Sequence, residues 1–208
     1  MEYIHLFLER ELLMDKDIHT IIREVMQVRY RGRKVQPFTS PGTIGRNTFA
    51  ELFRLLGFKK GAEIGVQKGK FAEVLCKGIP DLHLIGVDPW MKYNNIKQSV
   101  HDARYAETLE RLAPYNVTII RNLSVEASND VENGSLDFIN IDANHAFNYV
   151  MLDMLYWIPK VRSGGIILLH DYHDTQVRMA IDGYTYCNSI DPWYKTQEKQ
   201  VTAYWVQK

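Results

Sequence analysis

The sequence predicts an α/β fold built on a doubly wound, mostly parallel sheet with an antiparallel C-terminal hairpin. Short apolar runs of strand length alternate with helical patterns from about residue 48 onward. Most of these strand runs are continuously apolar, which is typical of strands buried on both faces of a sheet. With 208 residues, of which 46% are hydrophobic, the chain has the length and composition of one such domain with a short extension.

The N-terminal part is predicted to be helical and then irregular. Apolar residues recur at three-and-four spacing over residues 18–25, so we expect a helix up to about residue 30. Residues 31–45 are rich in Gly, Pro, Ser and Thr and predict a loop. We therefore divide the chain into an N-terminal helical extension with a candidate lid loop, residues 1–47, and a main domain, residues 48–208.

The main domain is predicted to begin with a helix. Thr48 and Glu51 form a T-x-x-E capping box, and Gly57 stands where a helix C′ glycine would. After it, we expect strands at residues 62–66, 82–87, 117–120, 136–141 and 166–169, and helices at residues 70–77, 99–112 and 147–157. The Gly164–Gly165 pair is predicted to be a turn before the last of these strands.

The C-terminal part predicts an antiparallel hairpin that closes one edge of the sheet. Residues 192–196 and 201–206 flank a polar turn. The hairpin is rich in Trp and Tyr, which either pack against the sheet or contact a ligand. An aromatic edge hairpin also makes a homodimer an expectation.

Charge and composition exclude several classes of protein. Lys and Arg number 25, as do Asp and Glu, so a dominant electrostatic grip on nucleic acid is not expected. The one dense basic run, Arg29 to Lys34, is either a solvated loop or a contact for an anionic group. Only two cysteines are present, Cys76 and Cys187, which favours a reducing cytoplasm. No signal peptide or membrane span is expected.

A ligand is expected where the parallel strands end, at the reversal of strand order. The first strand leads into Glu63-x-Gly65-Val66-Gln67-x-Gly69, in which the glycines allow either a structural turn or close approach to a ligand. Gln67 replaces the second glycine of a dinucleotide motif. The second strand ends at Asp88, placed to accept the hydroxyls of a ribose.

Two residues near these strand ends have open alternatives. Trp90 either stacks near a base or packs its loop. Ser124, after the third strand, either caps a short helix or contacts an adenine edge. Asp153, inside a predicted helix, is interpreted as structural, bonded to a loop backbone.

The densest polar positions follow the last two parallel strands. Asp142 is a candidate for holding a divalent metal or a cationic cofactor group, and His145 is a candidate general base. Asp171 follows the next strand and, with Asp142, would give an oxygen-rich sphere suited to Mg²⁺ or another divalent cation. His170 either joins that set or faces the core.

Three segments of the chain carry a resemblance to a known family: AEIGVQKGKFAEVL, LIGVDPW and DFINIDANHAFNYVMLDMLYWIPKVRSGGIILLHDY. In this order they resemble the class I S-adenosylmethionine (SAM)-dependent methyltransferases, and among them the small-molecule O-methyltransferases of the methyltransferase domain 24 type, near the macrocin-type sugar enzymes. The resemblance covers about residues 48–208 and implies a Rossmann-like, seven-stranded sheet.

The resemblance also implies roles for individual residues. Glu63, Gly65 and Gly69 would surround the methionine part of SAM, and Asp88 would hold its ribose. Residues from Asn122 to Ser124 would lie beside the adenine. Asp142 would lie near the reacting centre. In metal-dependent relatives the positions of Asp142 and Asp171 bind the ion, and in some of them the position of His145 holds the proposed base.

These observations favour methyl transfer from SAM to the hydroxyl of a small molecule, of the sugar or natural-product type. The two alternatives are a nicotinamide-dependent oxidoreductase, against which Gln67 counts, and a cofactor-binding module without catalysis. Neither nucleic acid nor a membrane is expected as a partner.

Overall fold

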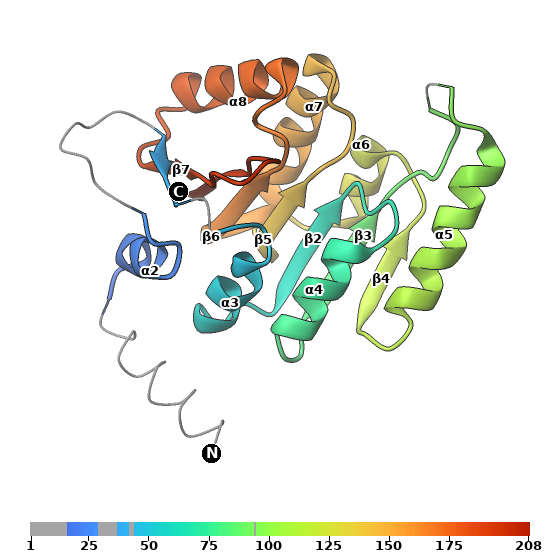
Figure 1. The fold of residues 1–208 in the computed structure, drawn as a ribbon, viewed down its shortest axis with the longest axis horizontal. Helices are drawn as coiled ribbons and strands as arrows, with labels where there is room; N and C mark the ends of the chain where they lie inside the picture. The colour runs from blue at the N-terminus through green and yellow to red at the C-terminus, as the bar shows by residue number, and fades with distance from the viewer. Residues whose placement is uncertain (1–15, 29–36, 42–43, 94) are drawn as a thin grey trace.

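The computed structural model describes residues 16–28, 37–41, 44–93 and 95–208, which form one mixed eight-stranded sheet with helices on both faces (Figure 1). The strand order is β1-β7-β8-β6-β5-β2-β3-β4. Strand β8 runs antiparallel to both of its neighbours, and all other pairs are parallel. The strands are β1 (Phe38–Thr39), β2 (Lys60–Ile64), β3 (His83–Val87), β4 (Val117–Ile120), β5 (Leu136–Ile141), β6 (Val161–Leu169), β7 (Trp193–Lys195) and β8 (Ala203–Val206).

Helices lie between consecutive parallel strands along the chain, as in crossover connections. They are α2 (Ile18–Val25), α3 (Thr48–Leu55), α4 (Lys70–Gly78), α5 (Gln98–Leu112), α6 (Ser124–Ala127), α7 (Phe147–Trp157) and α8 (Thr175–Cys187), with 3₁₀ turns at Ser128–Asp130 and Ile158–Lys160. From β2 the chain runs outward through β3 and β4, and then returns to the other side of β2 as β5. The reversal of strand order therefore lies between β2 and β5.

The sheet separates two apolar cores, because alternate residues of each strand point to opposite faces. Helices α2, α3 and α4 cover one face of the sheet, and α6, α7 and α8 cover the other (Figure 1). On β5, Phe138 packs with the cluster on the first face, while Ile139 packs with the cluster on the second. On β8, Tyr204 and Trp205 divide in the same way. The prediction of strands buried on both faces is confirmed.

The hairpin of β7 and β8 is confirmed, but it does not form the edge of the sheet. The two residues of β1 pair with β7, adding a strand from a segment that was predicted to be a loop. The hairpin aromatics Trp193, Tyr194, Tyr204 and Trp205 are 6%, 1%, 0% and 0% exposed. These four side chains pack inside the fold, so they offer no docking surface. The homodimer therefore stays a prediction that the hairpin does not support.

Two local predictions need correction, and one helix was not predicted. Asn47, not Thr48, is the N-cap of α3, and neither residue makes a side-chain cap bond, so the capping box is absent. Gly164 and Gly165 lie within β6, which starts at Val161; an irregularity in its pairing with β5 replaces the predicted turn. Helix α8 was not predicted at all. The C′ role of Gly57 is confirmed by its φ of 72° and the Phe58 N–H bond to the Phe53 carbonyl.

The basic run from Arg29 to Lys34 and the first fifteen residues of the predicted extension lie outside the described residues. None of the helices in the described ranges has the length and apolarity to cross a bilayer. Cys76 and Cys187 are both free thiols.

Candidate active site

The predicted polar residues gather where β2, β5 and β6 end. Backbone bonds hold these ends in line, because the Asp142 N–H donates to the Ile64 carbonyl (2.8 Å) and the His170 N–H to the Ile141 carbonyl (3.0 Å). Glu63 lies on the adjoining strand at the register position of Asn140. The parallel register thus places an acidic residue from each of three strands at one rim of the sheet.

The loop after β2 depends on its glycines. Gly65 has a φ of 95°, and a Cβ atom on it would lie 2.0 Å from the Asp142 carbonyl oxygen. Gly69 has a φ of 69° and is the N-cap of α4. Only glycine therefore fits at Gly65, where the loop touches the end of β5. The side chain of Val66 is buried in the core, so this residue offers the loop only its backbone.

Asp88 ties the glycine loop to the end of β3. Its two carboxylate oxygens accept the N–H groups of Gln67 (2.9 Å) and Trp90 (2.8 Å). Burial raises the pKa of Asp88, although both bonds favour its ionised form. Each oxygen keeps a further lone pair, so a ribose hydroxyl can still be accepted.

The structure favours the packing alternative for Trp90. The side chain is 1% exposed, and its ring centroid lies 4.8 Å from that of Tyr105. Its indole N–H donates to the Gln67 carbonyl at 2.8 Å. Trp90 therefore holds the glycine loop in place through its bond to the Gln67 carbonyl.

Of the two alternatives for Ser124, the helix cap is wrong, and the contact with an adenine edge stays a prediction. The N-cap of α6 is Leu123, and Ser124 donates to Asp153 Oδ1 at 2.5 Å while accepting from the Trp157 indole at 2.9 Å. Asp153 thus bonds a hydroxyl rather than a loop backbone, and burial raises its pKa to about 6. The side chain of Asn122 is exposed at the end of β4, where it accepts from the Leu123 N–H.

A histidine lies between the two carboxylates predicted to bind metal. His170 Nδ1 is 3.4 Å from Asp142 Oδ1 and 3.1 Å from Asp171 Oδ2. Burial lowers the pKa of His170, but the carboxylates outweigh burial and raise it to about 9. Asp171 has a φ of 58°, a strained conformation for a residue with a side chain.

His145 contacts the same carboxylate from the outside. Its Nε2 is 3.1 Å from Asp171 Oδ2, and its side chain is 43% exposed. The interaction with Asp171 raises the pKa of His145, and the two histidines together lower the pKa of Asp171 against the effect of its burial. His173 Nδ1 lies 3.6 Å from the other carboxylate oxygen of Asp171, Oδ1.

Arg46, which precedes α3, also reaches this rim. Its Nη2 is 2.9 Å from Asp142 Oδ2 and 3.6 Å from Glu63 Oε1. Its guanidinium lies 4.1 Å above the ring of Phe71. Burial nevertheless outweighs the arginine at Glu63 and raises the pKa of that carboxyl to about 8.

Polar atoms without an aligned partner concentrate at this rim. In the described part of the chain, eleven buried side-chain nitrogen and oxygen atoms lack a hydrogen bond, and seven of them belong to Arg46, Glu63, Asn140, His170 and Asp171. Several of these atoms are at ion-pair distance from each other but are not aligned for a hydrogen bond. Such a concentration of unsatisfied atoms is typical of a site that binds a polar ligand.

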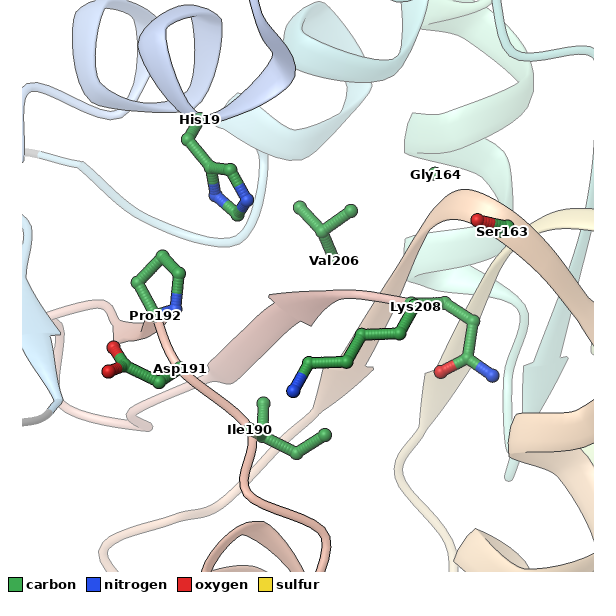
Figure 2. Close-up of a pocket in the computed structure, with 9 residues that line it drawn as sticks. His19, Ser163, Gly164, Ile190, Asp191, Pro192, Val206 and Lys208 are labelled. Carbon is green, nitrogen blue, oxygen red and sulfur yellow. The ribbon is translucent and has the colours of Figure 1, made fainter.

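Two cavities adjoin β6. The larger, about 250 Å³, lies at the amino end of β6 by Ser163 and Gly164, between His19 of α2 and the segment Ile190–Pro192 (Figure 2). It contains none of the predicted site residues. The smaller, about 10 Å³, lies under Asp142, His145 and His170. It has room for about one water molecule, so the chemistry belongs to the rim above it.

Comparison with known proteins identifies the fold and the family. The profile of a family described as "Methyltransferase domain" matches residues 62–172, which is more than half of the chain. The chain belongs to this methyltransferase family. The resemblance to class I SAM-dependent methyltransferases is thus confirmed, and the matched residues include every carboxylate of the rim.

Solved structures of low sequence identity share the fold of this methyltransferase domain. An O-methyltransferase from Bacillus cereus in complex with SAH is similar with a TM-score of 0.60 and 16% identity, over 95% of this chain and 94% of that one. The O-methyltransferase TomG from Streptomyces achromogenes, involved in tomaymycin synthesis and in complex with SAM, is similar with a TM-score of 0.57 and 13% identity, over 93% and 91%.

A curated relative is much longer than this methyltransferase domain. The uncharacterized protein y4gI of Sinorhizobium fredii is 26% identical over 125 residues, which are 57% of this chain and 13% of that protein. The chain therefore spans about an eighth of the length of the curated relative it matches.

The structure thus brings together most of the residues predicted for the site. Glu63, Asp142, His145, His170 and Asp171 share one rim, and Asp88 joins the adjacent glycine loop. Two residues of the rim were missed, Arg46 and Asn140. An asparagine inside the apolar run LDFINI was a signal for the second, whereas nothing in the local sequence marks Arg46 among other loop residues.

Proposed function

We propose that this protein transfers a methyl group from SAM to a hydroxyl of a small molecule. The observation that carries the proposal is the placement of Glu63, Asp88 and Asp142 at the ends of three adjacent strands, around the Gly65 loop, at the reversal of strand order. The family match adds the reaction class.

The residues of β2 and β3 would hold SAM. The backbone from Gly65 through Val66 and Gln67 to Gly69 offers a close approach to the amino-acid part. Asp88, already fixed by two backbone N–H groups, would accept the ribose hydroxyls. Asn122, exposed at the end of β4, would lie beside the adenine. SAM supplies an electrophilic methyl group on a cationic sulfur.

The residues of β5 and β6 would act on the acceptor. His145 is exposed enough to meet a substrate hydroxyl, and its neutral form would take the proton of that hydroxyl. Asp171 fixes the ring of His145 and stabilises the imidazolium that results. Asp142 would add negative charge that stabilises the cationic sulfonium of SAM. Alignment of oxygen, methyl and sulfur would account for much of the rate.

The donor set fits a divalent cation in number and spacing. Ligand atoms of Asp142, His170 and Asp171 all lie within 4.8 Å of one another. Two carboxylates with one imidazole suit Mg²⁺ or another divalent ion, provided that His170 has lost its proton. Such an ion would lower the pKa of the acceptor hydroxyl. We propose that a divalent metal at this position assists methyl transfer.

Incubation with SAM and a panel of sugar, phenol and polyketide-glycoside hydroxyls tests the proposal, with mass-spectrometric detection of S-adenosylhomocysteine and methylated product. We expect turnover with at least one class, and loss of turnover in EDTA that Mg²⁺ restores. Full activity in EDTA would remove the metal. Hydride transfer with a nicotinamide cofactor, or cofactor binding without turnover on any acceptor, would favour one of the two alternatives.

Two observations support a small molecule as the methyl acceptor. The similar structure of TomG belongs to a protein involved in tomaymycin synthesis. The balanced net charge of this chain gives no basic surplus for nucleic acid. A sugar or natural-product hydroxyl is therefore our proposed acceptor class.

A further inference from the structure

Arg46 lies at the rim of the site, and no role has yet been assigned to it. It lies outside the matched residues 62–172, yet its side chain is only 20% exposed and its guanidinium enters the site between two carboxylates. The ring of Phe71, in the first turn of α4, supports the flat face of the guanidinium from below. The arginine is thus held in place next to the glycine loop.

One edge of this guanidinium lacks aligned acceptors. Nε and Nη2 are both buried and without a hydrogen bond, although Nη2 is 2.9 Å from Asp142 Oδ2. The N–H bonds of these two nitrogens point to the same side and form the fork that binds a carboxylate with two parallel bonds. Buried donors of this kind are destabilising unless a ligand satisfies them.

We infer that Arg46 binds the carboxylate of the amino-acid part of SAM, a role that rests on the proposed function. Arg46 and Asp142 are a cation and an anion side by side, which is the complement of an amino-acid zwitterion. The ligand carboxylate would take the Nε and Nη2 fork, and its ammonium group would take the oxygen of Asp142 that now faces Arg46. Glu63 and Phe71, which both contact Arg46, flank in the sequence the Gly65–Gly69 loop that would hold this part of the ligand.

The inference is tested with two ligands that differ only in the carboxylate. S-adenosylhomocysteine and its decarboxylated analogue are titrated by calorimetry into the wild-type protein, R46Q, R46K and R54Q. Arg54 is a matched control, because it lies in the last turn of α3, the helix that follows Arg46, and takes no part in the ion pairs of the rim. The ratio of the two dissociation constants within one variant corrects for any loss of properly folded protein.

We expect the wild-type protein to prefer S-adenosylhomocysteine about ten- to hundredfold, as for a charge-assisted pair of hydrogen bonds. R46Q should abolish the preference by weakening S-adenosylhomocysteine alone. R46K keeps the charge but not the fork and should show an intermediate preference. R54Q should match the wild type.

Three outcomes would overturn the inference. Equal weakening of both ligands by R46Q would mean that Arg46 only arranges Glu63 and Asp142. Tighter binding of S-adenosylhomocysteine to R46Q would mean that Arg46 obstructs the site. Failure of the wild-type protein to bind either ligand would overturn the proposed function itself, and is distinguishable from the first two.

Discussion

At the scale of the residue, Gly65 joins the fold to the site. Its positive φ is one that side chains rarely adopt, and its missing Cβ lets the loop after β2 touch the end of β5. Both the cofactor loop and the position of Asp142 depend on this contact.

Gly65→Ala should therefore destabilise the protein by about 3 kcal/mol or more, because strain adds to a backbone clash. Urea unfolding measures the change. Gly134→Ala is the control: Gly134 has a similar φ of 66° with nothing within 4 Å of the added Cβ, so it should lose only about 1 kcal/mol. Equal losses in the two variants would show that the contact with Asp142 has no role.

His145→Gln should retain cofactor binding but lower turnover by about 10²- to 10⁴-fold, because it removes the proposed base. In the wild-type protein, turnover should rise with pH, since only neutral imidazole accepts a proton and Asp171 raises the pKa of His145. Steady-state rates between pH 5 and 9 provide the measurement. His173→Gln, at an exposed histidine near the same carboxylate, should keep most of the activity. Unchanged turnover in H145Q would exclude the role.

Asp153→Asn tests the Ser124 network. Burial raises the pKa of folded Asp153 from 3.8 to about 6, so the folded state binds the proton more tightly than the unfolded state. The stability from this residue is thus complete below about pH 4 and is lost as pH rises through 6. D153N should be more stable than the wild type at pH 7, by up to about 3 kcal/mol, and equal to it at pH 4. Denaturant unfolding at both pH values checks this, and lower stability of D153N at pH 7 would contradict it.

At the scale of the element, α8 shows what pattern reading overlooked. Asp174 is its N-cap and accepts the Gln176 and Val177 N–H groups, and buried Val177, Ala180 and Ile181 follow. Those signals were present in the sequence. They are hard to recognise because Asp174 directly follows the polar run from His170 to His173, which a loop would also explain.

Gly183→Ala should stabilise the protein by about 0.5–1 kcal/mol. Gly183 lies inside α8, and an added Cβ would have no atom within 4 Å, so the change only reduces the freedom of the unfolded chain. The midpoint of urea unfolding should increase without a change in slope. A decrease would contradict the prediction.

At the scale of the whole molecule, the site exists only in the folded chain, because its residues come from four strands and from the segment before α3. S-adenosylhomocysteine should therefore stabilise the fold. At a hundred times its dissociation constant it should add about 2.7 kcal/mol and raise the unfolding temperature by about 5–10 °C. Thermal unfolding with NAD⁺ as the control ligand measures this. A shift with NAD⁺ alone would support the oxidoreductase alternative.

The sequence by itself determined the order of the main elements and most of the site. Apolar runs and helical patterns are local, so the alternation that dictates a parallel sheet is readable along the chain. In such a sheet all parallel strands end at one rim, which is why Glu63, Asp88, Asp142 and Asp171 were predicted to be neighbours.

Only the tertiary structure decided what depends on distant packing. The two residues of β1 become a strand only because β7 offers an edge, and no local pattern records that pairing. Trp90 had two interpretations, and its burial against Tyr105 favours packing. Ser124 bonds Asp153 across the fold and does not cap the short helix that follows β4. Arg46 is 96 residues from Asp142 in the chain, and its charge acquires a role only when the fold brings these residues within 2.9 Å.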